Sequence, residues 1–129
     1  MLLPTDEAHL QTKGYDYEVL SDQGMICVLI RNFSLPPGYD RTNTDLLLRL
    51  PQGFPDAQPD MFWCDPPIRA ASTGNYPQAA DSIEQYMGRS WQRFSRHLAA
   101  GAWKPGIDTL RSFLTLVISE LKRAALSPS

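Results

Sequence analysis

The chain has 129 residues, of which 43% are apolar and 20% are charged, as in an ordinary globular protein. This length predicts one domain over residues 1–129, with a frayed tail at about 126–129, that can bury a core without disulfides or metal ions. The net charge of −2 gives no electrostatic reason to expect nucleic-acid binding.

A short helix is predicted near the start of the chain. Thr5 is a favourable residue at a helix start, and Asp6 and Glu7 place negative charge in the first turn, where the helix dipole favours it. Gly14 ends the pattern, so this helix is expected to be short.

Four strands are then predicted from alternating or β-branched apolar runs. A polar turn cluster joins the first two, and proline-rich loops join the others. Short connections of this kind favour an antiparallel meander. The predicted strands cover residues 15–20, 25–33, 45–50 and 60–64.

The second half of the chain is predicted to be irregular before it becomes helical. Residues 69–80 are small and polar and predict an exposed loop, and residues 80–88 predict a short helix between Asp81 and Gly88. Residues 89–105 show no clear period. From Gly106 the apolar residues recur at helical spacing, which predicts a long helix over residues 106–126.

This order of elements predicts an α+β fold, with a four-stranded antiparallel meander, a short N-terminal helix and a long C-terminal helix on one face of the sheet. Strands grouped together and followed by a helix are typical of this class. The final helix carries an apolar stripe that needs a sheet to cover it.

The remaining residue types argue for a cytoplasmic protein without cofactors. Cys27 and Cys64 lie in apolar runs and are interpreted as reduced, buried thiols, with a disulfide between neighbouring strands as the alternative. Two cysteines and two histidines far apart in sequence predict no metal site. The first residues lack the basic start of a signal peptide, and no apolar run is long enough for a membrane span.

Three segments, taken in order, resemble the ubiquitin-conjugating-enzyme fold. The segment "FPDAQPDMFW" resembles the aromatic and proline pattern that leads into the fourth strand of those enzymes. The segment "FSRHLAAGAWKP" resembles their active-site stretch, in which the nucleophile precedes a Trp-x-Pro motif, and "TLRSFLTLVISEL" resembles the helix that follows. The resemblance covers about residues 17–122 and is strongest to a divergent prokaryotic branch, the group called family E.

The sequence departs from this family at the reacting positions. The family's nucleophile is a cysteine, but its place before Trp103 is taken by Ser95. The acidic residue two positions later is replaced by His97. The His-Pro-Asn motif, whose asparagine steadies the oxyanion, is missing, and its place is expected near residues 86–89.

The resemblance implies acyl transfer, and the departures suggest how the chemistry is altered. A serine needs a base within hydrogen-bond reach, and the neutral imidazole of His97 suits that role near physiological pH. Ser95 would then carry the acyl group as an oxyester in place of a thioester. Arg96, Arg93 or Arg89 are candidates to stabilise developing negative charge, while Trp103 and Pro105 are expected to pack the joint before the final helix.

Two functions remain open at this point. The first is a bacterial conjugating enzyme that takes a ubiquitin-like protein from an activating-type enzyme and passes it to an unknown target. The second is an inactive adaptor that binds the activating enzyme or the ubiquitin-like protein without chemistry, which the missing His-Pro-Asn motif favours. Neither involves nucleic acid or a membrane, and kinship alone suggests a setting in antiviral defence.

Overall fold

The structure is a computed structural model that describes residues 2–59, 61–96, 103–105 and 107–126. Within these ranges, two helices frame six strands. The elements in order are α1 (Pro4–Thr12), β1 (Asp16–Asp22), β2 (Met25–Ser34), β3 (Asn43–Leu50), β4 (Met61–Asp65), β5 (Ser82–Tyr86), β6 (Arg89–Ser95) and α2 (Leu110–Leu126).

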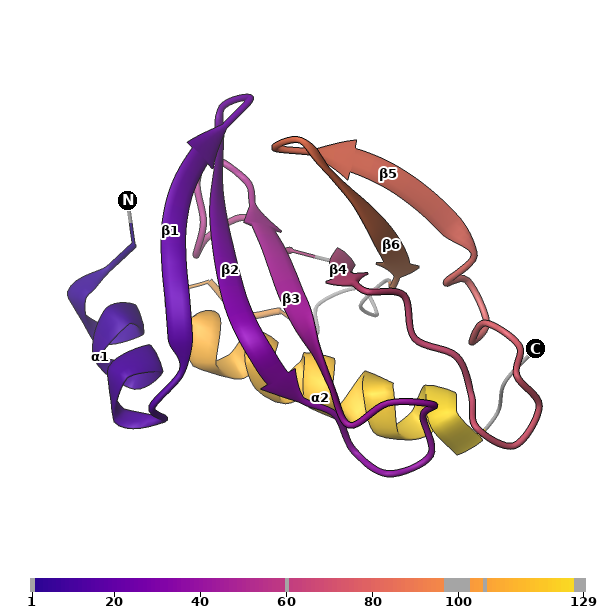
Figure 1. Cartoon of the computed structure of the whole chain (residues 1–129). Coiled ribbons are helices and arrows are strands. Elements are labelled where there is room, and N and C mark those ends of the chain that lie inside the picture. The colour runs from indigo at the N-terminus through magenta and orange to yellow at the C-terminus, as the bar shows by residue number, and fades with distance from the viewer. Residues whose placement is uncertain (1, 60, 97–102, 106, 127–129) are drawn as a thin grey trace.

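The strands form one antiparallel sheet in the order β1-β2-β3-β4-β6-β5. Helix α2 lies across one face of this sheet, and α1 lies beside β1 at its edge (Figure 1). The predicted α+β class and the position of the C-terminal helix are confirmed. The prediction of four strands is wrong, because the described residues contain a six-stranded sheet.

The two additional strands, β5 and β6, form a hairpin that the sequence pattern did not predict. Residues 80–88 were expected to form a helix, but β5 and β6 pair there, with Tyr86 opposite Arg89. Met87 and Gly88 both have positive φ, 54° and 75°, which fits the two-residue turn that suits the twist of a hairpin. Asn-Gly is the usual sequence signal for this turn, and Met in the first place hides it.

Helix α2 begins at Leu110, later than the predicted start at Gly106. Ile107 was expected on its apolar face but is 72% exposed. The main-chain amide of Lys104 donates to the Asp108 carboxylate at 2.7 Å, and this contact holds a turn before the helix. The helical spacing of apolar residues in the sequence therefore begins about one turn before the observed helix does.

The sheet has an apolar cluster on each face. The larger cluster fills the space between the sheet and α2, and it includes Phe62, Phe94 and Leu110. A smaller cluster lies on the outer face, away from α2, and consists of Cys27, Leu29, Leu47, Trp63 and Trp91. The Tyr86 ring covers it edge-on to Trp63 at 5.6 Å, so the β5–β6 hairpin closes the outer cluster.

Asp6 connects the two helices. Its Oδ1 accepts a hydrogen bond from the Leu110 amide at 3.3 Å, so a residue of α1 caps the first turn of α2. The side chain is buried, and Oδ2 has no hydrogen-bond partner among the described residues. Burial raises the pKa of the Asp6 carboxyl above its usual value.

Gln92 ties β6 to two segments that would otherwise lack partners. Its amide group, fully buried, accepts from the Ile68 amide at 2.8 Å and donates to the carbonyls of Ile68 and Ala80 at 3.1 and 2.9 Å. These bonds satisfy main-chain groups that strand pairing does not reach. The loop after β4 and the turn before β5 are thereby fixed against β6.

We predict that Asp6→Asn changes how stability depends on pH. The raised pKa means that the folded state holds this proton more tightly, so its contribution is full at low pH and is lost as the pH rises through the folded-state pKa. Chemical denaturation across the acid range should show the wild type losing free energy of unfolding with rising pH relative to Asp6→Asn. Glu7→Gln serves as the charge control, and parallel profiles for wild type and Asp6→Asn would contradict this expectation.

We also predict that Gln92→Leu lowers the free energy of unfolding by about 3 kcal/mol or more, because it leaves three buried main-chain groups without a hydrogen-bond partner. Gln85→Leu is the matched control, since the Gln85 side chain lies on β5 and, among the described residues, bonds only to the exposed side chain of Ser90. Urea denaturation of both variants measures the difference. Equal losses for the two would mean that the Gln92 bonds do not stabilise the fold.

Candidate functional site

Ser95 is the last residue of β6 and is partly buried. It pairs with Met61 of β4, and its amide donates to the Ala79 carbonyl at 3.0 Å. Phe94 packs in the cluster beneath α2, whereas Met61 packs on the outer cluster. Alternation along a strand therefore places the Ser95 side chain on the outer face, away from α2.

A pocket of about 430 Å³ opens at the end of β6, on the α2 side. Ser95 presents its carbonyl oxygen there, because Arg96 Nη1 donates to that oxygen at 2.8 Å. The wall of this pocket is mainly polar and charged. Its lining residues are Gln78, Ala79, Ser95, Arg96, Glu120, Arg123 and Ala124.

Arg96 joins the end of β6 to α2. Its Nε lies 3.1 Å from Glu120 Oε1, and both side chains are largely buried, at 15% and 12% exposure. Nη1 also donates to the Gln78 carbonyl at 3.1 Å. Burial lowers the pKa of Arg96, and the Glu120 carboxylate opposes that effect. The guanidinium thus holds three groups at once: α2, the turn before β5, and the main chain of Ser95.

Arg93 shares the outer face with Ser95, two residues away along β6. It forms an ion pair with Glu84 at 2.8 Å, and its Nε is buried without a hydrogen-bond partner among the described residues. Burial opposes ionisation of Glu84, but hydrogen bonds from Trp63, Tyr86 and Arg93, with the charge of Arg93, outweigh it and lower the pKa of Glu84. Of the three candidate arginines, Arg93 is the one that shares the outer face with Ser95, and its unpaired Nε is buried there.

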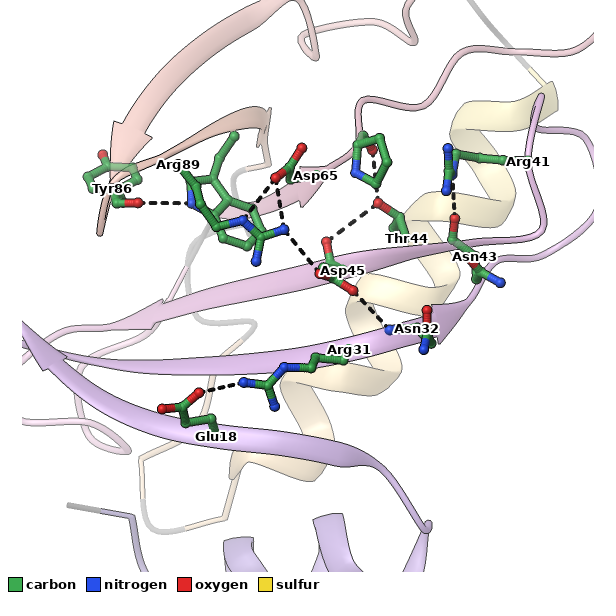
Figure 2. A network of polar contacts seen from close by, with 12 residues as sticks. Glu18, Arg31, Asn32, Arg41, Asn43, Thr44, Asp45, Asp65, Tyr86 and Arg89 are labelled. Atoms are coloured by element: carbon green, nitrogen blue, oxygen red, sulfur yellow. Dashed lines mark hydrogen bonds and ion pairs between the residues drawn. The ribbon is translucent and has the colours of Figure 1, made fainter.

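Arg89 lies at the other end of β6. Figure 2 shows its guanidinium between two carboxylates, with Nη2 3.0 Å from Asp45 and 2.8 Å from Asp65. It also stacks on Trp91 at 4.4 Å. Ser95 lies six positions further along the strand, roughly 20 Å away at the usual rise, so the structure does not bring Arg89 to the serine.

The joint before α2 has the expected packing at Trp103. Its side chain is 8% exposed, and its indole nitrogen donates to the Pro55 carbonyl at 2.8 Å. The ring lies 6.1 Å from Phe54, so Trp103 holds the proline-rich loop before β4. Pro105 is exposed. His97, the predicted base, lies outside the described residues.

Two features of the site were not predicted from the sequence. One is Glu120, whose helical position gave no sign that it faces Arg96. The other is the turn at residues 77–80, which lies beside Ser95 although the missing motif was expected near residues 86–89. That expectation is wrong, because residues 86–89 form the β5–β6 turn at the far end of β6. The turn at 77–80 lacks the glycine that would have marked it.

The cysteines are unsuited to carry an acyl group. Both are free and have no exposed surface. Cys27 lies in the outer cluster and Cys64 in the cluster beneath α2, so the alternative of a disulfide between them is wrong. Burial raises the pKa of both thiols, most strongly that of Cys64, which disfavours the thiolate needed for nucleophilic attack.

The described part of the chain contains no group of three or more His, Cys, Asp or Glu side chains placed to hold a metal ion. None of its helices combines the length and apolar character needed to cross a bilayer.

We predict that neither thiol is alkylated at an appreciable rate in the folded protein. Because both are sealed, labelling by iodoacetamide at neutral pH should be roughly a thousandfold slower than in denaturant, as expected when reaction requires unfolding. Ser90→Cys on exposed β6 surface is the control for reagent activity. Mass spectrometry measures the labelling, and rapid labelling of Cys64 in the native state would make it a candidate nucleophile again.

Comparison with known proteins agrees with this arrangement. The searches of curated proteins and of solved structures gave no match. A protein-family model described as prokaryotic E2 family E matches residues 2–124. This match covers both helices nearly completely and all six strands of the sheet. The chain belongs to the prokaryotic E2 family E.

Proposed function

We propose that this protein is a ubiquitin-like-protein conjugating enzyme that carries the acyl group on the hydroxyl of Ser95. The observation that supports this most is the contrast between its nucleophiles. Both thiols are sealed in the two clusters, whereas Ser95 is partly exposed at the end of β6. Family membership supports partners of the general kind, a ubiquitin-like protein and an activating enzyme.

The proposed reaction has two acyl transfers. Ser95 Oγ attacks the carbonyl carbon of a thioester on the activating enzyme, and its proton passes to His97. The C–S bond breaks, and the leaving thiolate takes the proton, which leaves an oxyester on Ser95. A target amine then attacks the ester carbon, the C–O bond breaks, and the proton lost by nitrogen returns to the serine oxygen.

An oxyester is less reactive than a thioester, so the second transfer depends on help from the protein. Orientation of the amine and stabilisation of the oxyanion are the two available sources. Arg93 is the candidate on the Ser95 face through the charge of its guanidinium, which is ion-paired with Glu84, because its unpaired Nε is buried. Arg89 and Arg96 remain candidates only through longer-range charge, because their guanidiniums are engaged elsewhere.

The second candidate function is an adaptor that binds the same partners without forming a covalent bond. The sealed thiols favour it, because they remove the thioester chemistry that the family's fold otherwise supports. The polar pocket beside Ser95 would then be a recognition feature. Formation of an adduct on this chain separates the two functions directly.

We predict that incubation with the cognate activating enzyme, the ubiquitin-like protein and ATP gives a covalent adduct that intact-mass spectrometry detects. The adduct should survive thiol reductants and be released by hydroxylamine, as an oxyester requires. Ser95→Ala should give no adduct, and Ser95→Cys should give one that reductants cleave. Ser90→Ala, which changes an exposed serine of the same strand, should behave as wild type.

Two outcomes would contradict this proposal. An undiminished adduct on Ser95→Ala would place the acyl group elsewhere. No adduct on the wild type, with an activating enzyme shown to be loaded in the same mixture, would favour the adaptor.

A further inference from the structure

We infer that the main-chain amide of Ala79 is the donor that stabilises the oxyanion formed at Ser95, and that Arg96 positions it. This inference rests on the proposed function, because it names a group that serves the Ser95 reaction. It supplies a donor for a chain that lacks the His-Pro-Asn motif. Four observations on the turn at residues 77–80 carry it.

The first observation is the conformation of this turn. The Ala80 amide donates to the Pro77 carbonyl at 3.1 Å, which closes a β-turn with Gln78 and Ala79 in the middle. Ala79 has φ of 55°, in the left-handed region that favours glycine. A positive φ at the third position of a turn reverses the peptide between the two central residues relative to the commonest turn. Strained main chain of this kind is frequent at functional sites.

The second observation fixes the direction of that central peptide. The Gln78 carbonyl accepts from Arg96 Nη1 at 3.1 Å, and the same guanidinium pairs with Glu120 of α2. The carbonyl therefore points toward the α2 side. The bond between Gln78 and Ala79 is trans, so the Ala79 N–H points the opposite way, toward the outer face.

The third observation is that Ser95 is next to this peptide and faces the same way. The Ser95 amide donates to the Ala79 carbonyl at 3.0 Å, so the two residues are neighbours across the sheet. Alternation along β6 places the Ser95 hydroxyl on the outer face as well. Within the described ranges, the Ala79 amide makes no hydrogen bond, so no described group competes with an incoming oxygen for it.

The fourth observation is the charge behind the peptide. A cation bonded to a peptide carbonyl withdraws electron density from the N–H and strengthens it as a donor. Arg96 is 15% exposed, so water screens this effect little. Arg96 does not reach the outer face itself. It acts through the peptide, as a positioning residue, and Glu120 holds it in place.

These elements form an oxyanion donor of the kind found in acyl transfer. When a nucleophile adds to the acyl carbon, negative charge develops on the carbonyl oxygen, and a fixed N–H at hydrogen-bond distance stabilises it. The same donor would serve formation of the oxyester and its attack by the amine, since the acyl carbon stays on Ser95 between the two steps. The main chain of this turn thus takes the role that the resemblance assigns to the asparagine of the His-Pro-Asn motif in other ubiquitin-conjugating enzymes.

The direct test replaces the Gln78–Ala79 amide by an ester through semisynthesis, which removes the N–H and keeps the carbonyl that Arg96 holds. Loss of one oxyanion donor should lower the single-turnover rate of transfer roughly a hundredfold or more. The unmodified sequence made by the same route, with the amide in place, is the control and should transfer at the wild-type rate. Circular dichroism is the check that both products are folded.

The role of Arg96 is tested with a matched pair. Arg96→Ala should lower kcat and change KM for the loaded activating enzyme little, because the guanidinium is largely buried and acts on the Ala79 peptide. Arg111→Ala removes an exposed arginine of α2 that does not line the pocket, and it should have little effect. Equal effects on kcat in the two variants, or a change confined to KM, would overturn the positioning role.

The failure of this inference is distinguishable from failure of the proposed function. If Ser95→Ala abolishes transfer and the ester-containing protein transfers at the full rate, Ala79 is not the donor and Ser95 remains the acceptor. If Ser95→Ala transfers normally, both proposals fall together.

Discussion

Strand β6 sends successive side chains to opposite faces of the sheet, and the position of every candidate group follows from this alternation. Gln92 and Phe94 lie beneath α2, where they are fully buried. Trp91 and Arg93 lie on the outer face with Ser95. A shift of one residue would bury the hydroxyl and expose Phe94, so the apolar core itself determines which face carries the chemistry.

Buried polar contacts then hold the end of this strand against its neighbours. Gln92 bonds to the segments on both sides of the long loop, and Arg96 bonds to the turn at residues 77–80 and to α2. Each of these contacts replaces water around groups that would be costly to leave unpaired. The same bonds that stabilise the fold therefore fix the Ala79 peptide beside Ser95.

Much of the fold was predictable from local patterns, and the failures have physical causes. The apolar period of α2 and the strands β1 to β4 left clear signals, apart from small shifts at their ends. The β5–β6 hairpin was missed because Met87 adopts positive φ where Asn is expected. A five-residue strand with mixed polarity and a capped start also fits a short helix, and only pairing with β6 decides between them.

The candidate site was likewise predictable in part. Spacing from Trp103 pointed to Ser95, but sequence distance gave no guide to which arginine lies near it. Arg89 is carried to the far end of β6, and Arg96 is turned toward α2 by the strand's alternation. Glu120 and the turn at residues 77–80 became visible only when tertiary contacts brought them to Ser95, because neither has a distinctive local sequence.

The central claim is that the acyl group resides on the hydroxyl at the end of β6. Tandem mass spectrometry of proteolytic fragments from the trapped adduct tests it most directly, since it locates the modified atom within the chain. The account predicts the remnant of the ubiquitin-like tail on Ser95. A remnant on a lysine or on either cysteine, with Ser95 unmodified, would contradict it.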